Sequence, residues 1–265
     1  MILRRTISGA LLIPIVSIPA YVGGPLYFIL VLGVATLAAY EFDDLMRAGG
    51  YRPERLWGFV LILLLIADAA FPGNGIMHSG LPLFVILTLA VPLGWRDLNG
   101  ALVNWALTLA GALYVGVLLA QFIVLRQLEL GLLLSAMVAF VTWTNDTAAY
   151  FIGTRFGRHP FVPRISPKKS WEGALGGGVL GALVGIVWGY FTLPTIPFYH
   201  LVILSVLIVC AGVIGDLAES LIKRQVGQKD AGGLIPGHGG VLDRIDSMMF
   251  AFPVTLLYAV WILKL

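Results

Sequence analysis

The stretch GDLAESLIKRQVGQKDAGGLIPGHGGVLDRID, residues 215–246, carries a dense set of charges in an otherwise apolar chain. It holds five acidic residues, four basic residues and one histidine, whereas the whole chain is 59% hydrophobic and only 12% charged. Its middle part, residues 227–240, contains six glycines and one proline. This composition is typical of a closely folded loop whose backbone approaches a ligand. The stretch therefore indicates a functional site.

The charges of this stretch are arranged in a way that suits a metal ion and phosphate groups. Asp216, Glu219 and Lys223 recur at helical spacing, so carboxylates and then cations share one stripe of a helix. Asp216 and Asp243 bracket the loop and are suited to a hard divalent cation. The basic residues suited to phosphate oxygens are Lys223, Arg224, Lys229 and Arg244. The alternative is a solvated loop with helix-end ion pairs such as Glu219 with Lys223, and the charges alone leave both open.

The order of residues from Ser220 to Asp246 resembles a family signature. It reads S-x-x-K-R-x4-K-D and then P-x-H-G-G-x-x-D-R-x-D. Across these 27 positions the run resembles the signature of the phosphatidate cytidylyltransferases, also called CDP-diacylglycerol synthases. The resemblance implies a membrane enzyme that joins CTP to phosphatidic acid and releases pyrophosphate.

A second polar segment, residues 142–173, also resembles motifs of that family, in W-x-x-D-x-x-A-Y and S-P-K-K-S-W-E-G. Lys168 and Lys169 are point charges suited to phosphate, with the hydroxyl of Ser166 beside them. Ser170 is expected to cap the following helix, with Glu172 in its first turn. The alternative is a simple positively charged membrane anchor. Whether this segment binds the nucleotide or the lipid phosphate is left open.

The resemblance and the charge pattern together predict a set of site residues. Asp216 and Asp243 are expected to ligate Mg²⁺, with Asp246 and Asp146 completing or supporting that shell; a second, monovalent or divalent, cation is left open. His238 is expected to donate to a phosphate oxygen or to protonate the leaving group. The expected catalytic residues are Asp216, Lys223, Arg224, Lys229, Asp230, His238, Asp243, Arg244 and Asp246. The expected substrate-binding residues are Ser166, Lys168, Lys169, Ser220, Lys223, Arg224 and Lys229.

Composition predicts an all-α polytopic integral membrane protein, because the mean hydropathy of the 265 residues is +0.93. The single cysteine, Cys210, excludes an intrachain disulfide framework. Nucleic-acid binding has no support, since the basic residues lie at membrane boundaries. We expect one membrane domain over residues 1–265, with N-terminal helices in 1–95, middle helices in 96–152 and a catalytic part in 153–265. Its cytoplasmic loops are expected at 153–171 and 223–246.

About nine membrane spans are predicted from the apolar runs, at 7–24, 25–42, 56–71, 81–95, 101–125, 131–152, 172–192, 199–222 and 247–264. With the N-terminus in the cytoplasm, only Arg126 and Lys264 of the 17 Lys and Arg residues fall outside. This bias supports the orientation and places the C-terminus outside. It predicts an active site facing the cytoplasm from a bacterial-type inner membrane, open to the lipid leaflet. Glu41, Asp43 and Asp44, opposite Arg47, Arg52 and Arg55, are expected to form a solvated cytoplasmic face.

Two further features of the chain bear on assembly and on rival functions. Glycines repeat every fourth residue at 173, 177, 181 and 185, which predicts close helix packing or dimerisation, and we expect a homodimer.

An ion-coupled transporter is the main rival function, although the chain shows no repeated halves. A CDP-alcohol phosphotransferase is the second rival, but its spaced-aspartate motif is absent from the sequence.

Overall fold

The computed structural model describes residues 13–94, 98–234 and 239–265, and most of these residues are helical. The first helix covers Ile13–Val22. Three short segments interrupt or extend the later helices: η1 (Val91–Gly94), η2 (Leu113–Val117) and η3 (Ala259–Leu263). The later helices are α2 (Gly24–Ala48), α3 (Arg55–Ala70), α4 (Ile76–Ala90), α5 (Ala101–Ala112), α6 (Leu118–Gln127), α7 (Gly131–Phe156), α8 (Trp171–Thr192), α9 (Phe198–Gln225) and α10 (Leu242–Tyr258).

Every apolar run predicted as a span contains a helix in the described part of the chain. Six helical segments there are long and apolar enough to cross a membrane: Gly24–Ala48, Ile76–Gly94, Ala101–Gln127, Trp171–Thr192, Phe198–Gln225 and Leu242–Leu263. The protein is therefore a helical polytopic membrane protein, as the composition predicts. Helix α3 has 16 residues, fewer than the about 20 that a perpendicular span needs. The count of nine spans and the orientation of the termini stay predictions.

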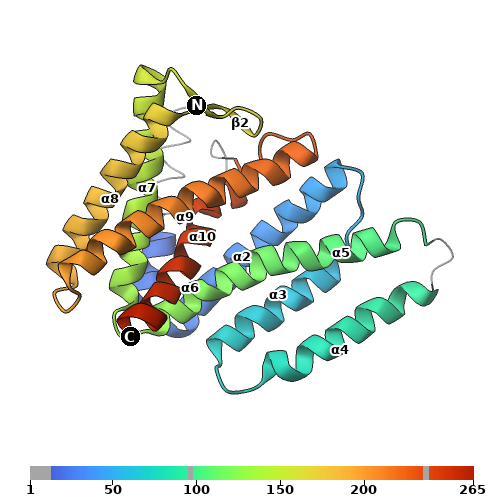
Figure 1. Cartoon of the computed structure of the whole chain (residues 1–265). Coiled ribbons are helices and arrows are strands. Elements are labelled where there is room, and N and C mark those ends of the chain that lie inside the picture. The colour runs from blue at the N-terminus through green and yellow to red at the C-terminus, as the bar shows by residue number, and fades with distance from the viewer. Residues whose placement is uncertain (1–12, 95–97, 235–238) are drawn as a thin grey trace. The chain divides into compact units, whose positions relative to one another are not determined.

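The chain divides into two compact units. Unit 1 comprises Met1–Val124 and Gln225–Arg244, and unit 2 comprises Leu125–Arg224 and Ile245–Leu265. In unit 1, α3 packs against α2, α4, α5 and η2 (Figure 1). Glycine allows η2 to approach α3, because a Cβ at Gly116 would meet Leu65, and it allows α5 to approach α2, because a Cβ at Gly111 would meet the ring of Phe42.

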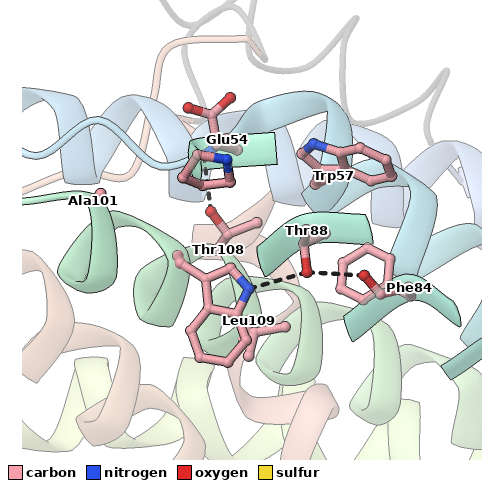
Figure 2. Close-up of a pocket in the computed structure, with 9 residues that line it drawn as sticks. Glu54, Trp57, Phe84, Thr88, Ala101, Thr108 and Leu109 are labelled. Carbon is pink, nitrogen blue, oxygen red and sulfur yellow. Dashed lines mark hydrogen bonds between the residues drawn. The ribbon is translucent and has the colours of Figure 1, made fainter. Parts of the chain in front are cut away.

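A small pocket among α3, α4 and α5 lies in unit 1 (Figure 2). Its wall is largely apolar, with the rings of Trp57, Phe84 and Trp105. The indole N–H of Trp105 donates to Thr88 Oγ1 at 3.0 Å. Glu54 is the one ionisable side chain among the described residues that line it. A pocket with so little charge does not suit polyphosphate chemistry.

Helices α7 and α8 of unit 2 pack side by side along much of their length (Figure 1). The glycine stripe of α8 makes this possible, and all its members are buried: Gly173, Gly177, Gly181, Gly185 and Gly189. A Cβ at Gly177 would lie 2.6 Å from the carbonyl oxygen of Asn145 on α7, and one at Gly185 would lie 2.6 Å from Ser205 Oγ on α9. The stripe therefore serves packing within the chain, and it gives no support to a dimer.

Replacing Gly177 by alanine is expected to destabilise the protein by about 1–3 kcal/mol, because the added methyl group meets the backbone of α7 and forces it to move. Gly33→Ala on α2 is the control, since a Cβ there has nothing within 4 Å and alanine favours a helix over glycine. Thermal unfolding in detergent micelles should show a lower Tm for Gly177→Ala and an unchanged or higher Tm for Gly33→Ala. Equal shifts for the two variants would show that close packing at Gly177 is not needed.

The polar segments differ from the loops expected at 153–171 and 223–246. The first contains an antiparallel pair of strands, β1 (Pro160–Val162) and β2 (Ser166–Ser170), so the fold is not wholly α-helical. The predicted cap of α8 is confirmed, because Ser170 Oγ accepts from the N–H of Gly173 at 3.2 Å. The second segment is shorter than expected, since α9 ends at Gln225 and α10 begins at Leu242. Asp243, Arg244 and Asp246 thus belong to the first turns of a helix.

Candidate active site

Three predicted acidic residues gather in unit 2. Asp146 lies on α7, Asp216 on α9 and Asp246 on α10. The carboxylates of Asp146 and Asp216 both lie close enough to that of Asp246 to interact with it electrostatically. We call these residues the acidic cluster. Charges brought together within a membrane protein are costly and mark a polar cavity or a functional site.

Lys169 reaches the acidic cluster from β2. Its ammonium group forms an ion pair with Oδ2 of Asp216, and it also interacts electrostatically with Asp146. The side chains of Lys169 and Asp216 are 29% and 28% exposed, so the pair is accessible to solvent. Because the pair is accessible, an anionic substrate can replace Asp216 as the partner of the Lys169 ammonium group.

Neutral side chains orient the carboxylates of the cluster. Ser247 Oγ donates to Asp146 Oδ2 at 3.3 Å, and Asn145 Nδ2 donates to Asp146 Oδ1 at 3.0 Å. Ser220 Oγ donates to Asp216 Oδ1 at 3.4 Å, and its predicted role in substrate binding stays a prediction. Sequence reasoning missed Asn145 and Ser247. The available signal was that each adjoins a predicted acid in the chain, Asp146 or Asp246.

Gly215 on α9 lets α10 come close enough to bring Asp246 to the acidic cluster. A Cβ at Gly215, next to Asp216, would collide with the carbonyl oxygen of Asp246 and lie 3.1 Å from the ring of Phe250. One turn earlier, Gly212 faces Ser247 of α10 and Thr142 of α7 at ordinary contact distance. Glycine at 215 therefore brings the backbones of α9 and α10 together beside the acidic cluster.

The acidic cluster offers the kind of ligand that a magnesium ion prefers. Its carboxylate oxygens are hard donors. Oδ1 of Asn145 is buried and accepts no hydrogen bond within the described part of the chain, which leaves one more oxygen. In the conformation described for residues 13–94, 98–234 and 239–265, however, no group of three or more acidic, histidine or cysteine side chains is arranged to hold a metal ion. The donor chemistry fits Mg²⁺, and Lys169 supplies the positive charge in this conformation.

The predicted basic residues of α9 contact groups of unit 2. Lys223 Nζ lies 2.7 Å from Glu219 Oε2, and both side chains are nearly buried. Arg224 Nε donates to the carbonyl oxygen of Ile165 in the turn between β1 and β2 at 3.2 Å. The ion pair between Glu219 and Lys223, predicted from the sequence as the alternative to a ligand site, is therefore present, but it is buried and not solvated. Glu219 itself was not predicted as a site residue, yet its charge acts on Asp246.

The remaining predicted residues lie in less enclosed places. Lys168 on β2 and Arg244 on α10 are exposed, as are Lys229 and Asp230 in the segment after α9, whereas Ser166 is half-buried. His238 lies outside the described residues.

Asp243 connects two described parts of the glycine-rich segment (residues 227–240) of unit 1, those on either side of residues 235–238. Its Oδ2 accepts hydrogen bonds from the N–H groups of Ala231 and Gly240, both at 3.0 Å. Gly239 adopts a φ of 82°, and a Cβ there would lie 3.2 Å from the same oxygen. Asp243 thus ties the two sides of the loop together. Asp243 belongs to unit 1, and the acidic cluster to unit 2, so its predicted share in one metal site stays a prediction.

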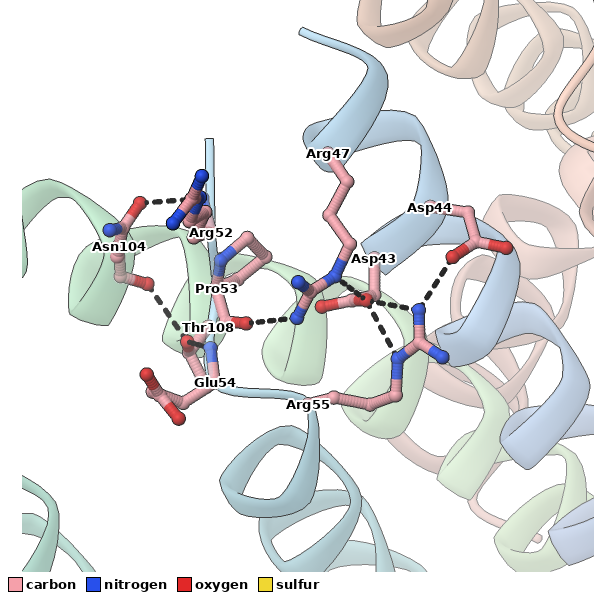
Figure 3. A network of polar contacts seen from close by, with 9 residues as sticks. All are labelled: Asp43, Asp44, Arg47, Arg52, Pro53, Glu54, Arg55, Asn104 and Thr108. Carbon is pink, nitrogen blue, oxygen red and sulfur yellow. Dashed lines mark hydrogen bonds and ion pairs between the residues drawn. The ribbon is translucent and has the colours of Figure 1, made fainter. Parts of the chain in front are cut away.

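The expected solvated face at the end of α2 is wrong for Glu41 and Asp43, which are buried, whereas Asp44 is exposed. Glu41 and Asp43 are only 2% and 5% exposed. Asp43 Oδ2 accepts from the side chains of both Arg47 and Arg55, each at 2.7 Å, and Arg55 also pairs with Asp44 (Figure 3). Glu41 takes no part in that network and instead contacts the glycine-rich segment, through Val241 and Leu242. Periodicity placed these acids at a helix end but did not show what would cover them.

The fold is that of a helical membrane protein, and its unit 2 gathers three carboxylates and a lysine on neighbouring elements. The chain matches the model of the cytidylyltransferase family over residues 3–262. It is 33% identical to the phosphatidate cytidylyltransferase of Haemophilus influenzae over 282 residues, covering 96% of each chain. The phosphatidate cytidylyltransferase of Bacillus subtilis is 28% identical, over 94% of each chain, and that of Brucella suis 31%, over 96% of this chain and 92% of the relative. The chain belongs to the cytidylyltransferase family, and it is a nucleotidyltransferase.

Proposed function

We propose that this chain joins CTP and phosphatidic acid to give CDP-diacylglycerol and pyrophosphate. The observation that carries the proposal is the acidic cluster with Lys169 in a membrane chain that matches a cytidylyltransferase family over nearly its whole length. The relatives of similar length are named phosphatidate cytidylyltransferases, which supports phosphatidic acid as the acceptor. We further propose that the site faces the cytoplasm from a bacterial-type inner membrane, where nucleotides are found.

The reaction requires charge neutralisation more than proton transfer. An oxygen of the lipid phosphate attacks the α-phosphorus of CTP, and the bond from that phosphorus to the bridging oxygen of the β-phosphate breaks to release pyrophosphate. A phosphate monoester loses its second proton near pH 6, so the nucleophile is largely dianionic at neutral pH. The difficulty is that both reactants are anions that repel each other, and positioning with electrostatic stabilisation overcomes this.

The charged residues of the chain divide this work between them. Six cations bind phosphate oxygens and so position the two reactants relative to each other: Lys169, Lys168, Lys223, Arg224, Lys229 and Arg244. Asp146, Asp216 and Asp246, with Asp243, are the residues proposed to hold Mg²⁺. When bound, Mg²⁺ supplies positive charge that offsets the charge of the phosphate oxygens. Asp216 also orients Lys169 until substrate arrives, because the two side chains are paired.

The test is direct synthesis by the purified protein. Protein in detergent micelles is incubated with CTP labelled at the α-phosphorus, phosphatidic acid and Mg²⁺, and the label is followed into the lipid fraction by chromatography. Transfer of label to a lipid that runs with CDP-diacylglycerol is the expected result. No transfer with phosphatidic acid, together with substrate uptake into proteoliposomes, would overturn the proposal in favour of the transporter. The homodimer stays a prediction that chromatography with light scattering checks on the same sample.

A further inference from the structure

Glu41 of α2 contacts a segment that lies 200 residues further along the chain. Its Oε1 accepts from the N–H of Val241 at 3.0 Å, and its Oε2 accepts from the N–H of Leu242 at 2.8 Å. These N–H groups stand at the start of α10, where a helix provides no partner of its own for its first amides. A carboxylate there also interacts favourably with the helix dipole. Glu41 thus acts as a cap for α10 supplied by a distant helix.

Two described glycines, Gly232 and Gly240, leave room for the Glu41 carboxylate. A Cβ at Gly240 would lie 2.7 Å from Oε2 of Glu41, and one at Gly232 would lie 2.7 Å from Oε1. Neither glycine has a positive φ, so space for Glu41 is the reason that a side chain is excluded at both positions. A Cβ at the neighbouring Gly233 would have nothing within 4 Å. Glycine is therefore sterically required at 232 and 240 but not at 233.

The position of Glu41 gives it an influence on the site without contact to a substrate. It is 2% exposed, and both of its oxygens are used on main-chain N–H groups of the chain itself. Asp243 lies one residue beyond Leu242 and ties Ala231 to Gly240. Displacement of the Glu41 carboxylate would therefore release the start of α10 and move Asp243 with it.

We propose that Glu41 is a positioning residue of the nucleotidyltransferase site. It holds residues 240–242 and the first turn of α10 in the conformation in which Asp243 and Arg244 face the substrates. The roles of Asp243 and Arg244 rest on the proposed function, whereas the hold of Glu41 on residues 239–243 does not. A positioning role predicts a local effect, confined to the segment that Glu41 contacts.

The first test is Glu41→Gln in the full-length protein. The amide has one accepting oxygen in place of two and turns an N–H donor toward a main-chain N–H, so one hydrogen bond is lost and the negative charge with it. Activity is expected to fall about 10- to 100-fold, the range for residues that orient the groups of a site without contacting the substrate. Hydrogen–deuterium exchange should speed up in peptides containing Val241 and Leu242 and stay unchanged in peptides of α3 and α7. Asp44→Asn, on the same helix, is the control for loss of a charge.

Three results would overturn the proposal. Unchanged activity with unchanged exchange at Val241 and Leu242 would mean that Glu41 does not stabilise the start of α10. Faster exchange at those residues with full activity would mean that the contact does not serve the site. Faster exchange throughout unit 1, α3 included, would mean a general structural role. If the wild-type protein transfers no cytidylyl group to phosphatidic acid, the proposed function fails while the exchange data still test the contact.

The glycines provide a second test that does not depend on the folding of Glu41→Gln. Gly232→Ala and Gly240→Ala are expected to lower activity and speed up exchange at Val241 and Leu242, whereas Gly233→Ala should do much less. Glu41→Asp shortens the acid by one methylene and makes room for the methyl group of Gly240→Ala. The double variant should therefore lose less activity than the product of the two single losses, as expected for residues in contact. Equal effects at 232 and 233, or strictly additive losses, would contradict the fit.

Discussion

Replacing Asp216 by asparagine is expected to lower the turnover of CTP at least about a hundredfold, the loss seen when a charge-stabilising group is removed from an active site. Asparagine has nearly the same shape but no charge, so it cannot hold the ammonium group of Lys169 as the carboxylate does. It also weakens the negative charge that the acidic cluster offers to a cation. Label transfer from CTP into lipid measures the loss, and thermal unfolding reports on the fold.

The fold should survive this change, because the Asp216 side chain is 28% exposed and does not belong to the packed core. Asp44→Asn is the matched control: Asp44 is also an aspartate in an ion pair, with a side chain that is 47% exposed. An exposed pair contributes only about 0–1 kcal/mol, and turnover should stay within about twofold of the wild type. If Asp216→Asn kept nearly normal turnover with a normal Tm, Asp216 would have no part in the chemistry.

The second large effect is expected at Asp243, where two variants separate two roles. Asparagine keeps an oxygen that accepts from Ala231 and Gly240, so the loop stays tied, but the charge proposed to help hold Mg²⁺ is lost. Alanine loses the tie as well as the charge. Both variants should lose about a hundredfold or more in turnover. Only Asp243→Ala should speed up hydrogen–deuterium exchange at Ala231 and Gly240.

A different pattern would assign Asp243 to the loop alone. If Asp243→Asn were nearly as active as the wild type while Asp243→Ala was inactive, the two hydrogen bonds would account for its importance. The acidic cluster of unit 2 would then be left as the proposed cation site. The dependence of activity on Mg²⁺ concentration gives an independent check, because loss of a ligand raises the concentration needed for half-maximal activity and loss of a tie does not.

The sequence predicted the helices well because long apolar runs in a membrane protein leave the backbone few other conformations. It also predicted the cap at Ser170, a local contact between residues three apart. The helical spacing of Asp216, Glu219 and Lys223 indicated that α9 continues past the apolar run, but hydropathy alone ended that span at residue 222 and began the last one only at 247, whereas α10 begins at Leu242. Charged residues at the end of a membrane helix can continue the helix into the polar region, so a boundary placed where hydropathy changes falls inside the helix.

The acidic cluster could be anticipated in part. Asp146 and Asp216 fall near the ends of segments predicted to run in the same direction, which suggested similar depth. That Lys169 would pair with Asp216, 47 residues away, could not be read from spacing, since it depends on how β2 folds back against α9. The antiparallel pairing of β1 with β2 could not be predicted either, because strands of three and five residues are too short to show an alternation of apolar and polar side chains.

The sequence alone determined that this is a helical membrane protein with a charged, glycine-rich segment whose motif indicates cytidylyl transfer. Apolar runs and short motifs are local properties, because they depend only on residues that are close together in the sequence. The tertiary structure alone decided that the glycine stripe of α8 packs within the chain, that Lys169 meets Asp216, and that Glu41 caps α10. These contacts join residues far apart in the chain, and such partners are chosen by the packing of whole helices.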